Sequence, residues 1–432
     1  MDSIGIGLAG FGTVGGGVYK NLEANRALLS QRLGASLDVR RIVVRDLAKV
    51  RNVAAPASLF SGNLDDLIND PEIRVVVELM GGVDIPLAFV RKAIEAGKIV
   101  ITGNKALLAE HGAELFRLAN EKRVPIFYEA AVAGGIPIIK SVREAFVANR
   151  FESIHGILNG TSNYILTRMT EAGLSFEAAL AEAQALGYAE SDPTLDINGW
   201  DAAHKAIILA SLAYGFWVKA ADVFVAGIDR LTSDDIKFAS QLGYAIKLLA
   251  TIRSDSSNSI EVRVCPTLIP KSHVLASVKG VFNAVWLRGD VVGESLFYGR
   301  GAGQDPTASS VIADLGECVV ALASPRRCYG FTSHDLYGKL KPTDEVVSQF
   351  YLRLLVDDRP GVLAQIAGIL GEAGIGISSV IQPESHEAGP LPLVLMIHDA
   401  SFGITREAVA RLAALGCVKA EPALLPVETF SA

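Results

Sequence analysis

The N-terminal segment most constrains the fold, because a short apolar strand leads into closely spaced glycines and then into a helix. It reads "IGIGLAGFGTVGGGVYKNL", in which Gly10, Gly12 and Gly15 form a G-x-G-x-x-G pattern. In such a turn the first glycine permits the tight bend and the second lets a pyrophosphate approach the backbone. The third glycine lets the helix pack close to the strand. The N–H groups at the helix start then face the phosphates.

A lone glycine pattern is weak, but the segments that follow support it. Apolar strand candidates occur at "DVRRIVVR", "RVVVEL", "KIVIT" and "VPIFYEA", with helical stretches such as "IPLAFVRKAIEAG" and "ALLAEHGAELFRLANEK" between them. This alternation predicts a parallel sheet covered on both faces, and hence a Rossmann-type domain that binds a dinucleotide. The predicted cofactor-binding residues of the turn are Gly10, Phe11, Gly12, Thr13, Val14 and Gly15.

The end of the second strand bears on which dinucleotide is bound. An NAD site usually has a carboxylate here for the ribose hydroxyls. This strand ends in "VVRD", so that Arg45 comes first and Asp46 and Lys49 follow. A guanidinium suits a 2′-phosphate, so we expect NADP(H) to be preferred over NAD(H). In the alternative, Arg45 is a solvated charge and Asp46 contacts the ribose.

A lysine follows the fourth strand, in "TGNKALLAEHG". Lys105 and the nearby Gly103 would lie at the carboxyl edge of the sheet, where ligands bind in open α/β folds. We therefore expect both residues to lie near the cofactor. A solvated lysine at a helix start is the alternative for Lys105.

Asp201 and Lys205 stand four apart in the otherwise apolar helical segment "INGWDAAHKAIILASLAYG". This spacing puts them on one helix face. One interpretation is an exposed ion pair, worth less than about 1 kcal/mol. The apolar surroundings favour another, in which a partly buried lysine donates a hydrogen bond to a carbonyl oxygen and then a proton to the alkoxide formed by hydride addition. Upstream, Glu190 could hold a cationic substrate group, and Asp196 is a plausible N-cap of the helix.

Composition excludes several function classes. The chain has 432 residues, enough for two or three domains, and a net charge of −7 without the clustered basic surface of a nucleic-acid-binding protein. The N-terminus has no signal-peptide pattern, and apolar runs such as "AIILASLAYGFWV" are too short for a membrane span. We expect a cytoplasmic protein with reduced thiols. Its cysteines are Cys265, Cys318, Cys328 and Cys417.

The C-terminal segment predicts a separate small module. "FYLRLLV" alternates like a strand, and the following Leu363, Ile366, Ala367 and Leu370 have the spacing of an amphipathic helix. Two further strands, "GISSVIQ" and "LPLVLMIH", precede the helix "TREAVARLAALG" and a closing strand in "AEPALLPVE". The predicted order is βαββαβ.

Several blocks together resemble the homoserine dehydrogenase family. They are "GFGTVGGGV", "TGNKALLA", "YEAAVAGGIPII", "GILNGTSNYIL", "AQALGYAESDPTLDINGWDAAHK" and "GRGAGQDPTASSVIADL", and they cover most of residues 1–320 in the family's order. The tail resembles an ACT domain, above all in "DDRPGVLAQIAGIL". The resemblance implies NAD(P)-dependent interconversion of L-aspartate 4-semialdehyde and L-homoserine, a branch step toward threonine and methionine.

The resemblance also implies roles for the acidic and basic residues. Lys205 is the implied proton donor, and Asp201 positions it and touches the substrate hydroxyl. Glu190 would bind the substrate's amino group, and Asp196 would bind substrate or order the loop. Lys105 would lie near the nicotinamide and share the proton-transfer role.

Two further sets of residues follow from the resemblance. Gly187 and Gly303 would approach the cofactor from the catalytic side. A bend that displays main-chain carbonyls would hold a monovalent cation, Na⁺ or K⁺, because such hard cations prefer oxygen ligands. The matching cation-binding positions are Glu129, Val132, Gly134 and Ile136.

The predicted fold class is α/β, with a Rossmann-type parallel sheet, an α+β catalytic and dimerisation domain, and a βαββαβ ACT domain. A homodimer or homotetramer is expected. The implied effector of the ACT domain is L-threonine, with the turn at Arg359, Pro360 and Gly361 as its best candidate contact. The predicted boundaries are 1–137 for the nucleotide-binding domain, completed by about 305–330, then 138–304 for the catalytic domain, 331–349 for a linker and 350–432 for the ACT domain.

Two other functions compete with this one. A sugar or imine dehydrogenase of similar architecture can also carry a lysine after the fourth strand, but the block "DPTLDINGWDAAHK" argues against it. A regulatory protein that binds NADP and an amino acid without catalysis would need no proton donor. The joint presence of Lys105, Glu190, Asp201 and Lys205 argues against such a regulator.

Overall fold

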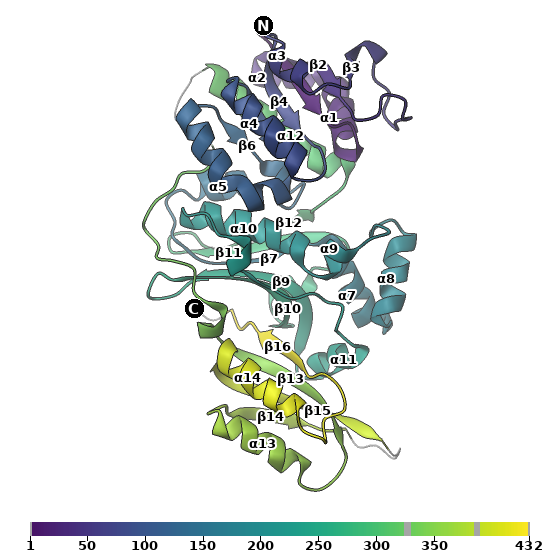
Figure 1. Ribbon diagram of the computed structural model, residues 1–432, viewed down its shortest axis with the longest axis vertical. Coiled ribbons are helices and arrows are strands. Elements are labelled where there is room, and N and C mark those ends of the chain that lie inside the picture. The colour runs from purple at the N-terminus through teal and green to yellow at the C-terminus, as the bar shows by residue number, and fades with distance from the viewer. Residues whose placement is uncertain (1, 324–329, 384–388, 431–432) are drawn as a thin grey trace. The chain divides into compact units, whose positions relative to one another are not determined.

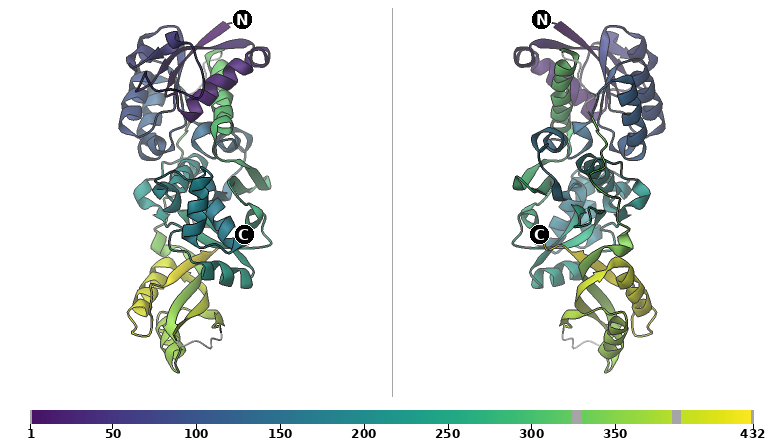
Figure 2. Two further views of the ribbon diagram at one scale, coloured as in Figure 1. Left: turned by 90° about the vertical axis from the view of Figure 1, so that its right-hand side faces the viewer. Right: turned by 90° about the vertical axis from the view of Figure 1, so that its left-hand side faces the viewer.

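The computed structural model describes residues 2–323, 330–383 and 389–430, which divide into two compact units (Figure 1 and Figure 2). The division runs through helix α10 (Trp200–Tyr214). Cys328 and residues 324–329 of the predicted domain completion lie outside the described residues. Unit 1 comprises Met1–Glu152, His204–Ala221 and Asn283–Tyr337, and unit 2 comprises Ser153–Ala203, Asp222–Phe282 and Gly338–Ala432.

Unit 1 is built on a parallel sheet with the strand order β3-β2-β1-β4-β5-β6. The order reverses between β1 and β4, which creates the crevice at the carboxyl ends of the strands where dinucleotides bind. The predicted Rossmann-type sheet is therefore confirmed. The strands are β1 (Asp2–Ala9), β2 (Ala35–Val43), β3 (Phe60–Ser61), β4 (Ile73–Glu78), β5 (Ile99–Thr102) and β6 (Ile126–Phe127).

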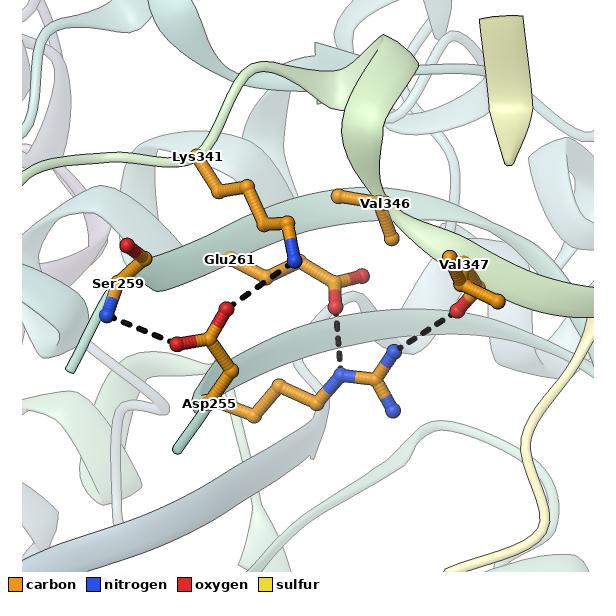
Figure 3. A pocket seen from close by; sticks show the side chains of 7 residues that line it. Asp255, Ser259, Glu261, Lys341, Val346 and Val347 are labelled. Carbon is orange, nitrogen blue, oxygen red and sulfur yellow. Dashed lines mark hydrogen bonds and ion pairs between the residues drawn. The ribbon is translucent and has the colours of Figure 1, made fainter. Parts of the chain in front are cut away.

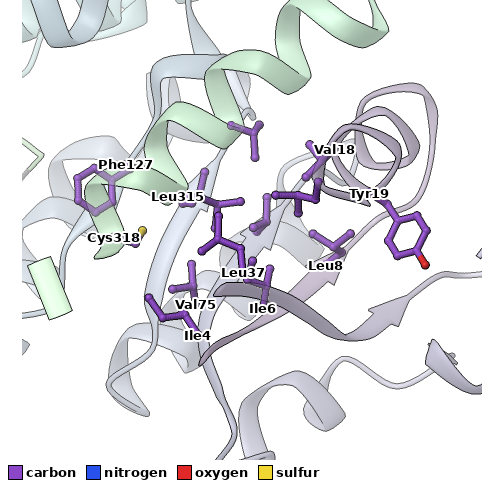
Figure 4. Close-up of a cluster of buried hydrophobic side chains, with 14 of the residues drawn as sticks. Ile4, Ile6, Leu8, Val18, Tyr19, Leu37, Val75, Phe127, Leu315 and Cys318 are labelled. Carbon is purple, nitrogen blue, oxygen red and sulfur yellow. The ribbon is translucent and has the colours of Figure 1, made fainter. Parts of the chain in front are cut away.

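Helices cover both faces of this sheet, which explains the continuous apolar runs in its central strands β4 and β5. In Figure 2, α1 and α12 lie on one face and α4 and α5 on the other. Figure 4 shows the core under α12, where Ile6, Leu8 and Val75 of the strands meet Leu315 and Cys318. The helices are α1 (Thr13–Ala24), α2 (Arg26–Leu33), α3 (Asp65–Asn69), α4 (Asp84–Glu95), α5 (Lys105–Lys122), the short α6 (Ile138–Lys140) and α12 (Gln304–Ala323).

Helix α12 corrects one expectation from the sequence. Its 20 residues are long and apolar enough to cross a membrane by length and composition, although no apolar run was expected to reach that length. The face that carries Ala308, Val311 and Leu315 is fully buried in the core of unit 1. A buried core helix has the same composition as a membrane span, and the structure shows α12 in the first of these roles.

The end of α10 is packed firmly within unit 1. Trp217, just beyond the helix, lies so close to α5 that a Cβ atom at Gly112 would be 1.9 Å from its ring. Phe116 packs against the same tryptophan in a tilted arrangement and Phe331 in an edge-to-face one. Strands β11 (Phe282–Gly289) and β12 (Gly293–Arg300) precede α12.

Unit 2 contains the strand order β7-β9-β10-β16-β13-β15-β14, with β8 beside β10. Its last part has the predicted order βαββαβ, and α13 and α14 pack together over the apolar core of that module. The strands are β7 (Phe151–Ile157), β8 (Phe224–Val225), β9 (Tyr244–Ser254), β10 (Ile260–Pro270), β13 (Val347–Asp357), β14 (Ile377–Ile381), β15 (Pro390–Ser401) and β16 (Ala423–Val427). The helices are α7 (Gly160–Ala172), α8 (Phe176–Ala185), α9 (Thr194–Ile197), α11 (Ser233–Gln241), α13 (Val362–Glu372) and α14 (Phe402–Ala413).

Buried charges join the C-terminal module to the rest of unit 2. The side chain of Asp235 completes a capping box with Thr232 at the start of α11 and accepts hydrogen bonds from Arg353 and Tyr351 of β13. On β10, the fully buried Arg263 pairs with Glu261 and with Glu428, which follows β16. Removing one partner of such a buried pair typically costs about 3–5 kcal/mol, so these contacts hold the seam firmly.

Glu78 ends β4 as a fully buried carboxyl group beside the crevice of unit 1. One carboxyl oxygen accepts from the N–H of Met80 and the other from the hydroxyl of Thr102, which in turn accepts from the N–H of Asn104. Burial raises the pKa of Glu78 to about 7, although these hydrogen bonds lower it. Glu78 thus ties the ends of β4 and β5 together.

The pKa of Glu78 predicts a pH-dependent stability. Below about pH 4.5 the Glu78 carboxyl is neutral in both the folded and the unfolded protein. As the pH rises, this carboxyl ionises first in the unfolded chain, so the free energy of unfolding decreases. The decrease ends once the pH passes the folded-state pKa of about 7. The whole effect is of order 3 kcal/mol. We expect the free energy of unfolding of Glu78→Gln, relative to that of the wild type, to increase between pH 5 and pH 8 in urea denaturation.

Glu95→Gln, at an exposed position on α4, is the matched control for the loss of one negative charge. A difference between Glu78→Gln and the wild type that stayed constant across this pH range would contradict the assignment.

Candidate active site

The glycine turn of unit 1 has the shape of a phosphate cradle. Gly10 has φ +105°, and a Cβ atom there would lie 2.6 Å from the carbonyl oxygen of Leu79. A Cβ atom at Gly15 would lie 2.3 Å from the oxygen of Gly10, whereas one at Gly12 would meet nothing within 4 Å. The middle glycine therefore leaves the backbone open to a ligand while the outer two close the turn. Helix α1 begins at Thr13 and directs its N-terminal dipole to this opening.

The loop after β2 gathers basic residues. Arg45 is exposed directly beyond the strand. One carboxylate oxygen of Asp46 accepts a backbone N–H two residues further on. Arg51 donates to the carbonyl oxygens of Asp46 and Lys49, and its guanidinium lies 5.0 Å from the ring centre of Phe60. Arg51, which the sequence analysis missed, thus fixes the loop that presents Arg45.

Lys105 is the first residue of α5, at the carboxyl edge of the sheet. The side chain of Asn104 caps this helix by accepting from the N–H of Leu107, and it donates to the carbonyl oxygen of Gly82. Lys105 itself is half-buried, and Gly103 packs against the side chain of Leu79. Asn104 and Glu78 could have been noticed in the sequence, because each is a polar residue at or just after the end of an apolar strand.

Residues 129–136 form a bend in unit 1 that displays carbonyl oxygens. Ala133 and Gly134 have φ values of +54° and +45°, so two consecutive left-handed residues turn the chain. The Ser310 hydroxyl donates to the carbonyl oxygen of Gly134. The carboxylate of Glu129 accepts the N–H groups of residues 139 and 140 at the start of α6, each at 2.8 Å. The Glu129 side chain is thus a helix cap, so any ligand of the bend would be bound by its main-chain oxygens, several of which also accept hydrogen bonds within the bend.

Two buried acids lie beside this bend. The N–H of Glu129 donates to a carboxylate oxygen of Asp314 on α12 at 2.9 Å. Burial raises the pKa of Asp314 well above its ordinary value, and the neighbouring Glu129 raises it further. Burial likewise raises the pKa of Glu129. Within the described ranges, no group of three or more His, Cys, Asp or Glu side chains could hold a metal ion. A cation here would therefore rely on main-chain oxygens, with buried acids nearby to offset its charge.

The start of α12 brings Gly303 back to the first helix. Gly303 has φ +119°, and a Cβ atom at Gly17 on α1 would lie 2.6 Å from the side chain of Gln304. Asp305 and Lys20 form an ion pair of 2.8 Å beside this contact. Unit 1 therefore assembles the glycine turn, Arg45, Gly103, Lys105, the bend 129–136 and Gly303.

In unit 2, the side chain of Asn159 links two of the predicted acidic residues. Its Nδ2 donates to Asp196 at 2.7 Å and to Asp201 at 2.8 Å. Asn159 follows β7 and is the N-cap of α7, where its Oδ1 accepts from the N–H of Ser162. No sequence pattern singled out Asn159, although it lies in the block "GILNGTSNYIL".

Asp196 does not have the capping role that the sequence analysis left open for it. It lies in the short helix α9, whereas α10 starts at Trp200, whose N–H donates to the side chain of Asn198. The expectation of an Asp196 N-cap on α10 was wrong, because the intervening chain forms a helix of its own. The carboxylate of Asp196 accepts from Asn159 instead.

Helix α10 carries Asp201 in its first turn and Lys205 one turn later. Both residues are only 8% exposed, and the alanines and isoleucines between and after them are buried completely. The interpretation as an exposed ion pair was therefore wrong. An electrostatic interaction between groups buried in this way is strong, because little water screens it.

Glu190 and Gly187 lie in the loop between α8 and α9. Both are exposed, and Gly187 has φ +73°. The hydroxyl of Thr161 on α7 donates to the carbonyl oxygen of Tyr188 in this loop at 2.7 Å. Unit 2 thus connects Glu190, Asp196 and Asp201 through the N-terminal turn of α7, while Lys205 belongs to the part of α10 assigned to unit 1.

A cavity of about 150 Å³ in unit 2 contains none of these residues (Figure 3). Its charged groups are paired with one another, Lys341 with Asp255 at 3.0 Å and Arg253 with Glu261 at 2.5 Å. The Ser257 hydroxyl, followed by Lys341, holds the pKa of Asp255 well below its ordinary value. The Lys341–Asp255 pair fastens the chain before β13 to the turn between β9 and β10, and the Arg253–Glu261 pair links these two strands. The lining residues are Arg253, Asp255, Ser259, Glu261, Lys341, Val346 and Val347.

Comparisons with known proteins agree with this assembly. The family models described as "Homoserine dehydrogenase, NAD binding domain", "Homoserine dehydrogenase" and "ACT domain" match residues 10–129, 137–315 and 350–417. A homoserine dehydrogenase from Pseudomonas aeruginosa is 45% identical over 442 residues, covering 100% of both chains.

Solved structures give the same result. The crystal structure of a homoserine dehydrogenase from Thiobacillus denitrificans has a TM-score of 0.93 and 42% identity, and the match covers 100% of this chain and 99% of that one. A hyperthermophilic archaeal homoserine dehydrogenase in complex with NADPH has a TM-score of 0.62 and 27% identity. This match covers 75% of this chain and 99% of that one. With a Rossmann turn, a buried Asp–Lys helix and an ACT module in this order, the chain belongs to the homoserine dehydrogenase family.

Proposed function

We propose that this dehydrogenase interconverts L-aspartate 4-semialdehyde and L-homoserine with NADP(H), as a branch step toward threonine and methionine. The observation that carries the proposal is the pair of buried ionisable residues, Asp201 and Lys205, one turn apart on α10. The open glycine turn fits a dinucleotide, which supplies or accepts the hydride when bound. The relatives named homoserine dehydrogenase support the choice of substrate.

In the reducing direction, the residues of this chain would manage the charge that develops on oxygen. The hydride and its electron pair form the new C–H bond, and the electron pair of the carbonyl π bond moves to oxygen. The ammonium of Lys205 donates a hydrogen bond to that oxygen and then transfers a proton to it. Asp201 keeps Lys205 protonated and oriented. Glu190 binds the substrate's ammonium group, Asp196 assists in binding, and Lys105 is the second candidate for proton transfer.

The cofactor preference would come from the loop after β2. Arg45 and Lys49 supply positive charge for a 2′-phosphate, and Arg51 holds that loop in place. The archaeal relative in complex with NADPH supports this reading. The cofactor-binding set is completed by Gly103, Gly187 and Gly303.

A monovalent cation, Na⁺ or K⁺, would bind the carbonyl oxygens of the bend 129–136. The left-handed residues Ala133 and Gly134 and the buried acids Glu129 and Asp314 fit such an ion. Its ligands would be the main-chain oxygens of Glu129, Val132, Gly134 and Ile136.

The ACT module would make the enzyme responsive to L-threonine, the end product of its branch. The turn before α13 is the proposed contact, because Gly361 has φ +90° at the N-terminus of that helix. The buried Asp235–Arg353 contact gives the module a firm connection to the rest of unit 2. We also propose that the protein is a cytoplasmic homodimer or homotetramer without nucleic-acid or membrane partners. Its proposed parts are the nucleotide-binding domain 1–137, completed by about 305–330, the catalytic domain 138–304, the linker 331–349 and the ACT domain 350–432.

The first prediction concerns proton transfer. We expect Lys205→Met to lower kcat by about 10²–10⁴-fold, the usual contribution of a general acid, and to retain NADPH binding. Absorbance at 340 nm with L-homoserine and NADP measures the rate, and NADPH fluorescence measures binding. The exposed Lys219, which follows the same helix, gives the control Lys219→Met. A kcat near that of the wild type for Lys205→Met would refute the role. A wild-type protein that binds NADPH but does not oxidise L-homoserine would favour the regulator without catalysis.

The second prediction concerns the dinucleotide. We expect Arg45→Ala to lower kcat/KM for NADP by about tenfold or more, because a charge-assisted hydrogen bond is lost, and to leave the value for NAD nearly unchanged. Asp46→Asn is the matched variant, since it retains the acceptor for the backbone N–H but loses the charge. Asp46→Asn could instead lower kcat/KM for NAD while Arg45→Ala changes kcat/KM for neither cofactor. In that case Asp46 contacts the ribose and Arg45 is a solvated charge.

The third prediction concerns regulation. We expect L-threonine to inhibit the wild type, and Arg359→Ala to raise the half-inhibiting concentration by about tenfold without changing the uninhibited kcat. Arg406→Ala, on the exposed surface of α14, is the control. Threonine sensing at this turn would be contradicted if L-threonine did not inhibit the wild type. It would also be contradicted if Arg359→Ala and Arg406→Ala had the same half-inhibiting concentration.

A further inference from the structure

The amide of Asn159 lies between two carboxylates in unit 2. Asp196 is on α9, Asp201 is on α10, and Asn159 starts α7, so the contact joins three helices. A carboxamide has two N–H hydrogens on one nitrogen, which allows one hydrogen bond to each carboxylate. Asn159 is 4% exposed, so little water is available to replace it.

The orientation of this amide is fixed by its other contacts. Its Oδ1 accepts from the backbone N–H of Ser162 at 2.7 Å, as the N-cap of α7. Exchanging the oxygen and nitrogen would put an NH₂ group against that N–H and an oxygen against two carboxylates, which is unfavourable on both sides. The hydroxyl of Ser162 also donates to the carbonyl oxygen of Asp196 at 2.7 Å. The start of α7 therefore holds both the backbone and the side chain of Asp196.

Two carboxylates held this close disfavour each other's ionisation, and the first proton lost from the pair leaves more readily than the second. A donor shared between them offsets this repulsion and favours the doubly ionised form. Because the amide is neutral, it does so without adding a positive charge that would compete with Lys205. The amide donates to two titratable groups, Asp196 on α9 and Asp201 on α10, and Lys205 follows one turn further along α10.

We propose that Asn159 is a positioning residue for the reaction, which keeps Asp196 and Asp201 ionised and aimed by donating one hydrogen bond to each. The inference rests on the proposed function, because it acts through Asp201 on Lys205. Asn159 touches neither substrate nor cofactor in this role. It sets the geometry and charge of the acidic groups that do.

Two substitutions separate this role from helix capping. Asn159→Ser retains an N-cap, since serine caps as well as asparagine, but its single hydroxyl cannot donate to both carboxylates. We expect kcat/KM for L-homoserine to fall about tenfold to a hundredfold, and its acid limb to move to higher pH. Asn159→Asp retains the shape and the cap but adds a third carboxylate. We expect it to be less active at pH 8 than Asn159→Ser.

Asn163→Ser is the matched control. Asn163 is a buried asparagine one turn later on α7, and its side chain donates to the carbonyl oxygens of Gly280 and Phe282 and accepts from Lys247. Losing these contacts should lower the melting temperature without moving the acid limb of the pH profile. NADPH affinity, measured by fluorescence, should be unchanged in all variants because none of them replaces a proposed dinucleotide-binding residue.

The full-length protein is assayed from pH 6 to pH 10 with saturating NADP. An acid limb that moves in Asn159→Ser but not in Asn163→Ser supports the positioning role. An unmoved limb in Asn159→Ser, or an equal shift in both variants, overturns it. If the wild type reduces no NADP with L-homoserine, the proposed function fails and this inference fails with it; an active wild type with an unaffected Asn159→Ser contradicts the inference alone.

Discussion

The cost of burying charge is the constraint on which the rest of this structure depends. Helix α10 carries Asp201 and Lys205, each 8% exposed, in a segment that is largely apolar and buried. A buried ionised group without partners would cost far more than the few kcal/mol by which a protein is stable, so each such group needs a donor, an acceptor or an opposite charge. The positions of α7 and α9 follow from this need, because the side chain of Asn159 at the start of α7 reaches both Asp196 and Asp201.

The same constraint explains how the C-terminal module is attached. Strand β16 lies between β10 and β13, and the charged residues along this seam are buried with their partners. Arg353 and Tyr351 reach across to Asp235, which also caps α11. A shift of the module that left Asp235 buried without Arg353 would carry a large cost. A signal from an effector would reach the rest of unit 2 through this contact.

Much of the fold could be predicted from the sequence, because strand periodicity and turn chemistry are local. The glycine turn, the parallel strands and the βαββαβ order all followed from patterns within about twenty residues. Helix α12 shows the limit of composition, since it is apolar and long enough for a membrane span and yet one of its faces is buried in the core of unit 1. Asp196 was misplaced because four residues sufficed to form α9, which no periodicity reveals.

The site was predictable only where its chemistry follows a motif. Asp201 and Lys205 were identified from their spacing, but their burial became clear only with the folded structure. Asn159, Arg51 and Glu78 were missed. Asn159 acts through partners far away in the sequence and Glu78 partly through Thr102, 24 residues away, whereas Arg51 contacts its own loop, in which no motif marks it. The contact of Asn159 with Asp201, for example, spans 42 residues. Nothing local distinguishes such a residue from an ordinary helix cap.

The chain uses different donors for its buried acids, and the differences follow function. Asp235 faces an arginine, and the carboxylate of Glu129 faces backbone N–H groups that also start a helix; both arrangements serve structure. An arginine beside Asp201 would neutralise it and repel the ammonium of Lys205. A neutral amide instead fixes the carboxylates and leaves their negative charge for cationic partners, which here would be Lys205 and the amino group of the substrate. For the proposed role of Asp201 beside Lys205, a neutral asparagine at position 159 therefore suits these acids better than an arginine would.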